Sequence, residues 1–310
     1  MSPNDGMALP AVAPAVAVHA LRKHFRLKPV RLFGPARVVH AVSDVSFELP
    51  AGQTLGIVGE SGCGKSTLAR LLMGLLSADA GEVTIAGARL DTAHAEGLKA
   101  LRRNMQMVFQ DSFASLNPRM TVESSIMFGP LVHGVGRDAA RATAHRLLER
   151  VGLAPAQFAG RYPHALSGGQ RQRVNIARAL ALQPKVVVFD EAVSALDKSV
   201  EIQVLNLLDD LRQEFALTYL FISHDLHVVQ YISDQVMVMY LGKVVEMGPA
   251  AEVCGSPRHP YTRALLASMP SMDPARRTLQ PPVMGDPPSP IDPPSGCRYR
   301  TDRKSTRLNS

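Results

Sequence analysis

The pattern of apolar and polar positions along the chain predicts alternating strands and helices. Val186 to Phe189 is an unbroken apolar run that ends in two acids, Asp190 and Glu191. Such a run is typical of a strand buried on both faces of a parallel sheet, which delivers its last side chains to the edge where α/β sheets place ligands. In Val200 to Phe215 the apolar residues repeat at helical spacing, so this segment is predicted to be a helix that packs on the sheet.

Further strands are predicted before and after this strand and helix. Their ranges are Ala15 to Phe25, Val38 to Leu49, Thr54 to Val58, Thr218 to Ser223, Gln235 to Tyr240 and Lys243 to Met247. Strand signals vanish between Asp111 and Ala165, where Asp138 to Val151 has the pattern of a helix. This order predicts an α/β protein with a strand-rich opening and an inserted helical segment.

The segment after the strand that ends at Val58 has the pattern of a nucleotide-phosphate loop. The residues expected to hold the nucleotide are Gly59, Glu60, Ser61, Gly62, Cys63, Gly64, Lys65, Ser66 and Thr67. The glycines let the backbone turn with its N–H groups facing inward, Lys65 reaches the β- and γ-phosphates, and the Ser66 hydroxyl can ligate Mg²⁺. A helix is predicted from Ser66 to Leu76. Such a loop predicts nucleotide binding but does not indicate the process that the nucleotide serves.

A second phosphate clamp lies further along the chain. Its residues are Leu166, Ser167, Gly168, Gly169 and Gln170, and they open a predicted helix from Gln170 to Leu182. A hydroxyl, backbone N–H groups and a helix N-terminus together suit an anion. One nucleotide cannot easily use two clamps on one subunit. The simplest arrangement is therefore two subunits head to tail, each closing its Ser167 loop over the nucleotide of the other.

Together the two motifs resemble the ATP-binding-cassette (ABC) ATPases. The resemblance implies an α/β fold with a P-loop NTPase (RecA-like) core, an antiparallel β subdomain and an inserted α-helical subdomain, with ATP and Mg²⁺ as ligands. Asp190 suits Mg²⁺, and Glu191 suits the general base for the attacking water. The competing interpretation of these two residues is that they are solvated acids at a strand end.

Four further elements match the same family. Gln110 corresponds to the glutamine that touches Mg²⁺ and the attacking water, and His224 to the histidine that contacts the γ-phosphate. The loop that crosses the dimer interface is matched by Ser194, Ala195, Leu196 and Asp197. Phe25 looks like the aromatic that stacks on adenine. A core aromatic is the competing interpretation of Phe25.

Four stretches narrow the resemblance to the ATPases of oligopeptide and dipeptide importers, and one of them is Val193 to Asp197. The other three are Ser115 to Thr121, His259 to Leu266 and Pro293 to Cys297. The same branch serves nickel and some glycoside importers, so the substrate stays open. Ala192 stands where the family often has proline, a loss of local stiffness that should leave the chemistry intact. We assign no metal cluster to the tail, because a single cysteine is no site.

The predicted domain organisation has four parts. We expect a flexible leader over residues 1–15, an ATP-binding cassette over 16–255 with its helical subdomain at about 111–165, and an importer-type extension over 256–301. Because the extension is rich in proline, we expect it to be poorly packed beyond one helix at Thr262 to Met269. Residues 302–310 look like the translation of a sequencing adapter, and we expect them to be an artefact. A native basic tail is the competing interpretation.

Composition and charge describe the setting. The formal net charge of +7 suits nucleic acid or an anionic membrane surface, and charge alone does not decide between them. The three cysteines are too few and too scattered for a disulfide framework, which agrees with a reducing cytoplasm. No stretch of the sequence approaches the ~18 consecutive apolar residues of a membrane-spanning helix.

The resemblance also implies partners. These are transmembrane permease subunits, a second ATPase subunit that is either identical or a paralogue, and indirectly an extracytoplasmic solute-binding protein, with the chain peripheral at the cytoplasmic face of the membrane. A cassette ATPase that acts on DNA or ribosomes is the competing class. We expect no nucleic-acid partner, because the DNA-repair relatives split this core with a long coiled coil and the ribosomal relatives carry two cassettes. A scaffold without hydrolysis would lack a base or a Mg²⁺ ligand, whereas both are present.

Overall fold

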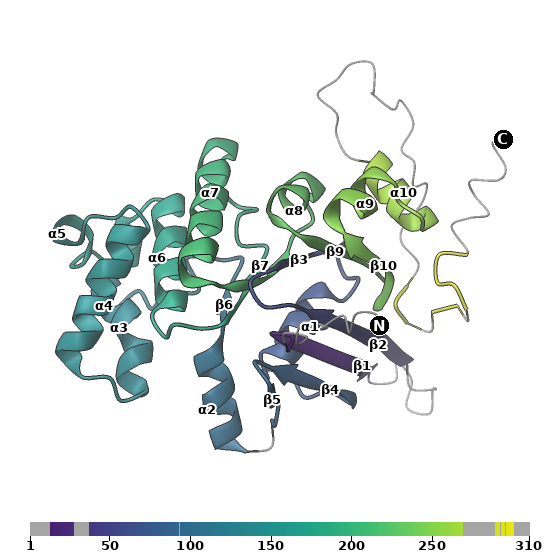
Figure 1. The fold of residues 1–310 in the computed structure, drawn as a ribbon, viewed down its shortest axis with the longest axis horizontal. Coiled ribbons are helices and arrows are strands. Elements are labelled where there is room, and N and C mark those ends of the chain that lie inside the picture. Colours follow the sequence, from purple (N-terminus) through teal and green to yellow (C-terminus); the bar gives the residue numbers. More distant parts are fainter. Residues whose placement is uncertain are drawn as a thin grey trace, which may run out of the picture.

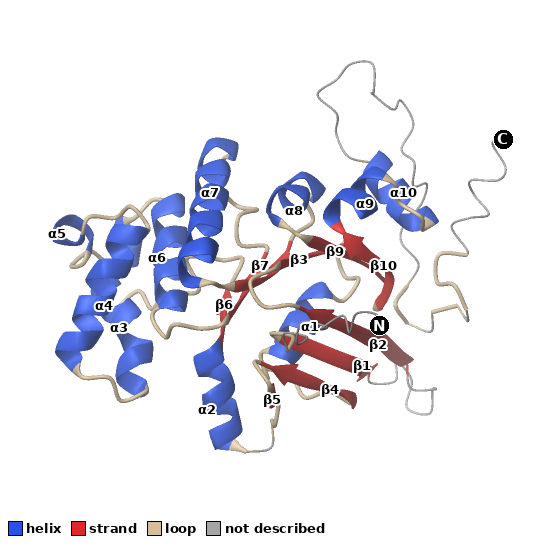
Figure 2. Cartoon of the chain, in the orientation of Figure 1, coloured by secondary structure: helices blue, strands red, loops and turns tan. Residues whose placement is uncertain are grey.

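The computed structural model describes residues 13–27, 37–92, 94–268, 289–291, 293–294 and 296–300. The described chain forms two β-sheets with helices around them, and a separate group of helices lies at one end of the molecule (Figure 1; Figure 2). Residues 1–12 of the predicted leader and the suspected adapter residues 302–310 lie outside the described residues.

The first sheet is antiparallel, as the strand-rich opening predicts. Its strands are β1 (Val16–Leu27), β2 (Arg37–Leu49), β4 (Ala80–Ile85) and β5 (Ala88–Arg89). They are paired in the order β2-β1-β4-β5. One face is apolar because Val16, Val18, Val42 and Val45 are fully buried. The sequence patterns for β1 and β2 are confirmed, whereas β4 and β5 are strands that the sequence analysis missed.

The second sheet holds the candidate site. Its strands are β3 (Thr54–Val58), β6 (Met105–Val108), β7 (Val186–Asp190), β8 (Thr218–Ile222), β9 (Gln235–Tyr240) and β10 (Lys243–Pro249). Their order is β10-β9-β3-β8-β7-β6, and all neighbours are parallel except β9 and β10. Every residue of β7 is buried, as its unbroken apolar run predicts. The carboxyl ends of β3, β6, β7 and β8 therefore meet at one edge.

Helix α1 (Lys65–Leu72) lies between the two sheets, below the centre of Figure 1. Its Leu68 and Leu72 are fully buried in a core cluster that includes Val42 of the antiparallel sheet and Ile57 of the parallel sheet. Packing on both sheets fixes the direction of α1 and of the loop that precedes it.

A helical region occupies the left side of Figure 1. It comprises α3 (Val122–Val132), α4 (Arg137–Arg150), the short α5 (Pro155–Phe158), a 3-10 turn (Pro163–Ala165) and α6 (Gly168–Leu180). The absence of strands that the sequence predicts for 111–165 is confirmed by the described residues of that range. The packing of Ala144, Leu148 and Val174 in one buried cluster joins α4 to α6.

The remaining helices cover the parallel sheet or follow it in the chain. They are α2 (Ala95–Asn104), α7 (Lys198–Phe215), α8 (Leu226–Ile232), α9 (Ala250–Gly255) and α10 (Pro260–Ala267). Most helix bounds differ from the predicted ones by a few residues, and two of these differences have a local cause. α1 stops before Gly74, whose φ of 63° is typical of a helix end, and does not run to Leu76. α6 starts earlier than predicted, at Gly168, because Ser167 caps it.

The prediction that the C-terminal extension is poorly packed beyond one helix is wrong for Arg298 and Tyr299, whereas the other described residues after that helix are partly buried or exposed. Tyr261 is 0% exposed, Tyr299 is 4% exposed and the Arg298 side chain is also buried. The two tyrosine rings pack on Tyr240 of β9. Proline content could not predict this packing, because it depends on the aromatic and basic side chains that anchor the segment to the core.

Candidate nucleotide site

The loop between β3 and α1 has a backbone that only glycine permits at two positions. Gly59 has φ 147°, and a Cβ there would lie 2.2 Å from the carbonyl oxygen of Met239. Gly64 has φ 110°, and a Cβ there would lie 2.1 Å from the carbonyl oxygen of Ala41. Neighbouring backbone therefore encloses the loop, and the glycines let it close this tightly.

Gly64→Ala is expected to lower the free energy of unfolding by about 1–3 kcal/mol, because the new methyl group overpacks against fixed backbone. Gly62→Ala is the matched control. Gly62 also has a positive φ, 78°, but an added Cβ would meet no described atom within 4 Å, so only the backbone strain of about 1 kcal/mol applies. Urea denaturation without nucleotide measures both. Equal losses in the two variants would contradict the enclosed loop.

Lys65 lies at the first position of α1 with its side chain turned back over the loop. Its Nζ donates to the carbonyl oxygens of Gly59 at 2.6 Å and Glu60 at 2.9 Å. Lys65 is 5% exposed. The carbonyl partners are neutral and carry no carboxylate that would compete with an anionic ligand for this side chain.

The Cys63 thiol shares this buried environment. Its Sγ lies 3.8 Å from the Lys65 Nζ. Burial raises the pKa of Cys63 above its usual value, so the side chain stays a thiol. Cys63 is 3% exposed, so its side chain packs into the protein.

Ser66 and Asp190 meet at the carboxyl edge of the sheet. The Ser66 hydroxyl donates to Oδ1 of Asp190 at 3.1 Å. The pKa of Asp190 is raised above its usual value, mainly because the carboxyl group is buried. The hydrogen bond from Ser66 opposes this shift, and the neighbouring Glu191 carboxylate adds to it. A buried carboxylate with a hydroxyl beside it supplies the oxygen donors that Mg²⁺ prefers, and a cation would offset the cost of burying the charge. These residues fit a magnesium ion.

Glu191 has an unusual backbone that aims its side chain along this edge. Its φ of 50° lies in the left-handed region, which costs energy for a non-glycine residue and is typical of functional sites. Two contacts hold it there. The Glu191 N–H donates to the Ile222 carbonyl at 2.9 Å, and the Ser194 hydroxyl donates to the Glu191 carbonyl at 2.8 Å.

The Glu191 carboxylate lies close to the two other predicted catalytic side chains, Gln110 and His224. Its Oε2 accepts a hydrogen bond from Nε2 of Gln110 at 3.0 Å and lies 3.5 Å from Nδ1 of His224. Strand register explains the meeting, since Val108 of β6 pairs with Phe189 of β7. Gln110 and Glu191 therefore leave adjacent strands at the same level. The structure brings together the residues that the sequence analysis proposed for catalysis.

Phe25 lies on β1, opposite Val39 of β2. It is partly buried and belongs to neither buried core cluster of the described residues, which disfavours the interpretation as a core aromatic. The Lys23 ammonium lies 5.7 Å from its ring centroid. Its stacking on adenine stays a prediction.

Ser167 begins α6 with a capping box. Its hydroxyl accepts from the Gln170 N–H at 3.3 Å, and the Gln170 side chain accepts from the Ser167 N–H at 3.0 Å. The Ser167 residue is exposed, whereas Leu166 is 5% exposed. Ser167 thus lies exposed at a rigid helix end, and the adjoining Gly168 and Gly169 are partly exposed.

The two glycines of this clamp face the start of α7. A Cβ at Gly169 would lie 2.6 Å from Cγ1 of Val200, so this glycine is needed for close packing. A Cβ at Gly168 would meet only Leu196, at 3.9 Å. Leu196 belongs to the predicted interface loop, in which Ala195 and Asp197 are exposed. The clamp and the interface loop therefore adjoin.

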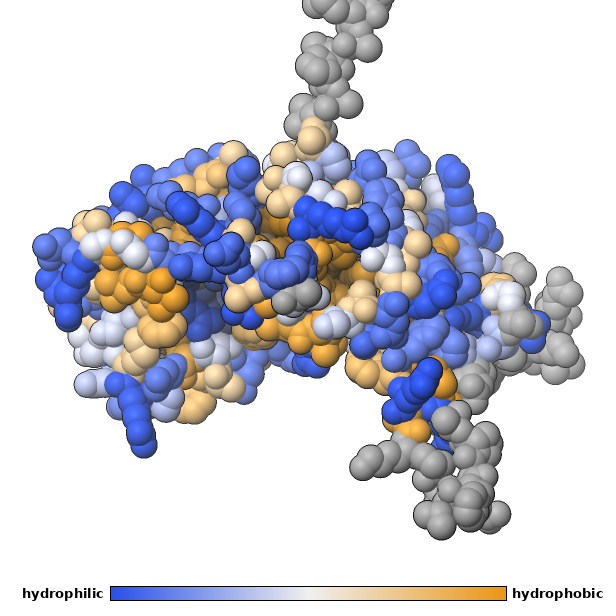
Figure 3. Space-filling view, turned by 90° about the horizontal axis from the view of Figure 1, so that it is seen from below, coloured by the Kyte–Doolittle hydropathy of each residue, from blue (hydrophilic) through white to orange (hydrophobic). Residues whose placement is uncertain are grey.

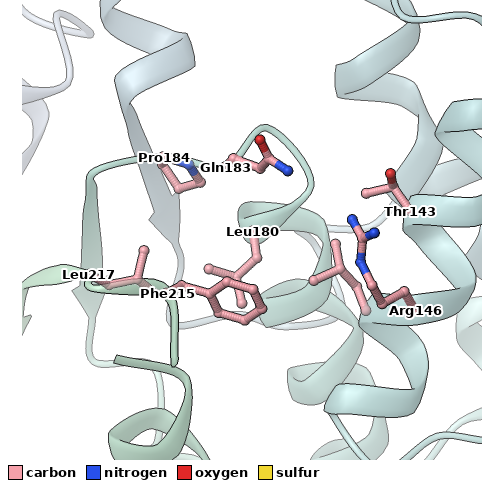
Figure 4. Close-up of a pocket in the computed structure, with 8 residues that line it drawn as sticks. Thr143, Arg146, Leu180, Gln183, Pro184, Phe215 and Leu217 are labelled. Carbon is pink, nitrogen blue, oxygen red and sulfur yellow. The ribbon is translucent and has the colours of Figure 1, made fainter. Parts of the chain in front are cut away.

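A cavity of about 140 Å³ lies at the opposite edge of the sheet. Figure 4 shows that side chains from three parts of the chain enclose it, with Leu180, Phe215 and Leu217 on one side and Thr143 and Arg146 on the other. Pro184 precedes β7, so the cavity is at the amino end of that strand. It is remote from Glu191, and we assign it no part in nucleotide binding.

The sequence analysis missed one residue of this site. The backbone N–H of Glu60, inside the phosphate loop, donates to the hydroxyl of Tyr261 at 3.0 Å. Tyr261 appears in the sequence only within the His259 to Leu266 stretch that marks the importer branch. The only sequence signal for the contact with Glu60 is that a tyrosine, an aromatic residue with a polar hydroxyl, lies within that stretch.

A parallel sheet that presents a glycine loop, a buried lysine and an aligned carboxylate pair at one edge defines a P-loop nucleotide triphosphatase. Two family models match the chain. The ABC transporter model covers residues 42–194, and the model for the C-terminal region of oligopeptide/dipeptide transporters covers residues 245–307.

Curated relatives agree with these models. The "Probable peptide ABC transporter ATP-binding protein y4tS" of Sinorhizobium fredii (strain NBRC 101917 / NGR234) is 50% identical over 284 residues, which are 91% of this chain and 80% of that protein. The "Glutathione import ATP-binding protein GsiA" of Escherichia coli (strain K12) is 52% identical over 275 residues, 88% of this chain and 44% of GsiA. The chain spans less than half of the length of GsiA.

Solved structures share the fold. The cbiO1 protein of Clostridium perfringens, part of the ABC transporter complex cbiONQ, has a TM-score of 0.68 and 27% identity, covering 79% of this chain and 92% of that one. The ATP-binding cassette MJ0796, in a dimeric post-hydrolysis state bound to ADP and Pi, has a TM-score of 0.67 and 26% identity. The match covers 76% of this chain and 98% of that one. The chain belongs to the ABC transporter family, in its oligopeptide/dipeptide branch, as an ATP-binding subunit with ATPase activity.

Proposed function

We propose that this chain powers the import of peptides, or of a related small solute, through a separate transmembrane permease. The observation that carries the proposal is the pairing of a complete nucleotide edge around Glu191 with the branch-specific C-terminal region. The relatives named for peptide and glutathione transport support the substrate class.

Within this proposal the phosphate loop binds ATP, and Lys65 neutralises charge on its β- and γ-phosphates. Glu191 accepts a proton from the attacking water as general base. Gln110 and His224, which both contact the Glu191 carboxylate, orient it and the water. Ser66, Asp190 and Gln110 would hold Mg²⁺, which neutralises developing charge on the phosphates.

We also propose that two cassettes form each complete site. The exposed Ser167 hydroxyl and the N-terminus of α6 suit the γ-phosphate of a partner's ATP, and the adjoining loop from Ser194 to Asp197 would line the same interface. The dimeric MJ0796 structure supports this arrangement. The partner cassette is either a second copy or a paralogue.

An apolar surface on the helical region offers a place for the permease. The exposed large apolar side chains of this region are Phe128, Leu131, Val132, Val135 and Tyr162, and two more, Phe109 and Phe113, lie in the loop that leads to it from β6. Figure 3 shows apolar surface at this end of the molecule among polar atoms. Exposed apolar patches mark interaction sites, so we propose that this face docks on the permease at the cytoplasmic side of the membrane.

Membrane attachment in this proposal is through that partner. Within the described residues, no helix combines the length and the apolar character that crossing a bilayer requires. An extracytoplasmic solute-binding protein would deliver the solute to the permease, and this chain would have no direct contact with it.

Uptake of radiolabelled di- and oligopeptides tests the proposal. Cells of the source organism that lack this chain are complemented with wild type or with Glu191→Gln. We expect uptake with wild type only, because the variant lacks the proposed base. Glutathione and Ni²⁺ are tested in parallel to separate the solutes. Restored peptide uptake with the Glu191→Gln chain would contradict the proposal that hydrolysis in this site drives import.

A further inference from the structure

The C-terminal extension reaches the phosphate loop through one tyrosine. Tyr261 lies on α10 and is 0% exposed, and its hydroxyl oxygen accepts the Glu60 N–H at 3.0 Å. The hydroxyl thus supplies the acceptor for a partly buried backbone N–H of the phosphate loop. The C-terminal extension therefore contacts the loop that is expected to bind phosphate.

The peptide unit that Tyr261 holds is also the one that holds Lys65. The Glu60 N–H and the Gly59 carbonyl belong to one planar peptide group. The Gly59 carbonyl accepts from Nζ of Lys65 at 2.6 Å. A continuous chain of hydrogen bonds therefore runs from the tyrosine hydroxyl through this peptide to the ammonium, and bonds in such a chain strengthen one another.

The tyrosine itself is fixed on several sides. Its ring centroid lies 4.4 Å from that of Tyr240 and 5.5 Å from that of Tyr299. The Glu246 carboxylate of β10 accepts the His259 N–H at 3.0 Å, which holds the start of α10. Burial raises the pKa of Tyr261 far above its usual value, so the hydroxyl stays neutral. A rigid, neutral acceptor is suited to orient a peptide group.

The end of the extension supports the same region. The buried Arg298 guanidinium donates to the Leu241 carbonyl and, at 3.0 Å, to the Ser43 hydroxyl. The next residue of the β9–β10 turn, Gly242, donates its N–H to the Cys63 carbonyl inside the phosphate loop at 2.8 Å. The extension thus reaches the loop directly through Tyr261 and indirectly through this turn.

We propose that Tyr261 is a positioning residue for ATP binding, which anchors the Gly59–Glu60 peptide and thereby holds Lys65 at the β- and γ-phosphates. The inference rests on the proposed role of Lys65. Tyr261 does not touch the nucleotide and acts through the backbone. Without its hydroxyl, the Glu60 N–H loses its acceptor, the peptide tilts to find another, and the carbonyl that orients Lys65 moves with it.

Tyr261→Phe tests the proposal, because it removes the hydroxyl and keeps the ring. We expect the ATP dissociation constant of the purified chain, measured by calorimetry, to rise about 3- to 10-fold, the effect of one net hydrogen bond. Tyr219→Phe is the matched control. Tyr219 is equally buried and its hydroxyl donates to the Leu208 carbonyl at 2.9 Å, a bond remote from the loop. Both variants should lower the melting temperature to a similar extent.

A double-mutant cycle separates positioning from general destabilisation. In a Lys65→Ala background, Tyr261→Phe should change the ATP dissociation constant by less than about twofold, since the side chain through which it acts is gone. The proposal is overturned if Tyr261→Phe binds ATP as Tyr219→Phe does, or if its effect persists without Lys65. Unchanged ATP affinity of Lys65→Ala alone would overturn the proposed phosphate loop as well, which distinguishes the two failures.

Discussion

ATP turnover of the Glu191→Gln protein is expected to fall by about 10²–10⁴-fold, the usual worth of a positioned general base. Glutamine has the shape of glutamate and its amide oxygen can still accept the hydrogen bond from Gln110, so the edge of the sheet keeps its geometry. The amide cannot take a proton from water. ATP affinity should change little, because the phosphate loop and Lys65 are untouched.

Phosphate release at saturating ATP measures this loss, with calorimetry for ATP affinity. Glu201→Gln is a suitable control, because Glu201 is a buried glutamate on α7 that pairs with Lys198 at 2.9 Å, outside the nucleotide edge. Its turnover should stay close to wild type. Turnover of Glu191→Gln within about threefold of wild type, far short of the loss expected for a general base, would remove Glu191 from that role.

Gly168→Asp is expected to lower ATP turnover by about 10²–10³-fold, comparable to the loss of a donor at a reacting oxyanion. The single chain should still fold and bind ATP. A Cβ at this position meets only Leu196, at 3.9 Å, and an acid in the first turn favours a helix. The same carboxylate would face the phosphates of the partner's nucleotide and repel them.

Gly168→Asn separates charge from size in this experiment, because asparagine has nearly the same volume and no charge. We expect it to lose less turnover than the aspartate variant, measured at equal protein concentration. Identical turnover in the two variants would show that repulsion of phosphate is not the cause. Loss of ATP affinity in the isolated Gly168→Asp chain would place the clamp at its own nucleotide.

Two residues of the catalytic edge, Asp190 and Glu191, could be predicted from a local sequence pattern, whereas Gln110 and His224 came from the resemblance to the family. The apolar run before Asp190 is a central parallel strand, and the acids at its end lie where such strands present ligands. The contact between Gln110 and Glu191 rests on the pairing of β6 with β7. The resemblance to the family supplied Gln110, since no local pattern places β6 beside β7.

The weakest strands were missed for a physical reason. β4 has an exposed first half, and β5 is only two residues long. Neither shows the apolar run or the clean alternation by which strands are recognised. Strands of this kind are stabilised by pairing with their neighbours, here β1 and β5 for β4, and not by their own sequence.

The contacts of the C-terminal extension could not be predicted either. Tyr261 meets Glu60 across 201 positions, and Arg298 meets Ser43 across 255. Each contact depends on a single side chain and leaves no periodic signal. Proline-rich composition favoured a loose segment, whereas buried aromatic packing decides the structure. Long-range contacts between single side chains are thus the part of this site that required the structure.

The composite site is tested most directly by light scattering coupled to size-exclusion chromatography of the Glu191→Gln chain, alone and mixed with its paralogue. Without hydrolysis to release it, each ATP bridges two surfaces, so we predict dimers with ATP and monomers without it. Adding Gly168→Asp should abolish the dimer and leave ATP binding by the monomer intact. An ATP-dependent dimer that forms equally well with Gly168→Asp would contradict the head-to-tail site.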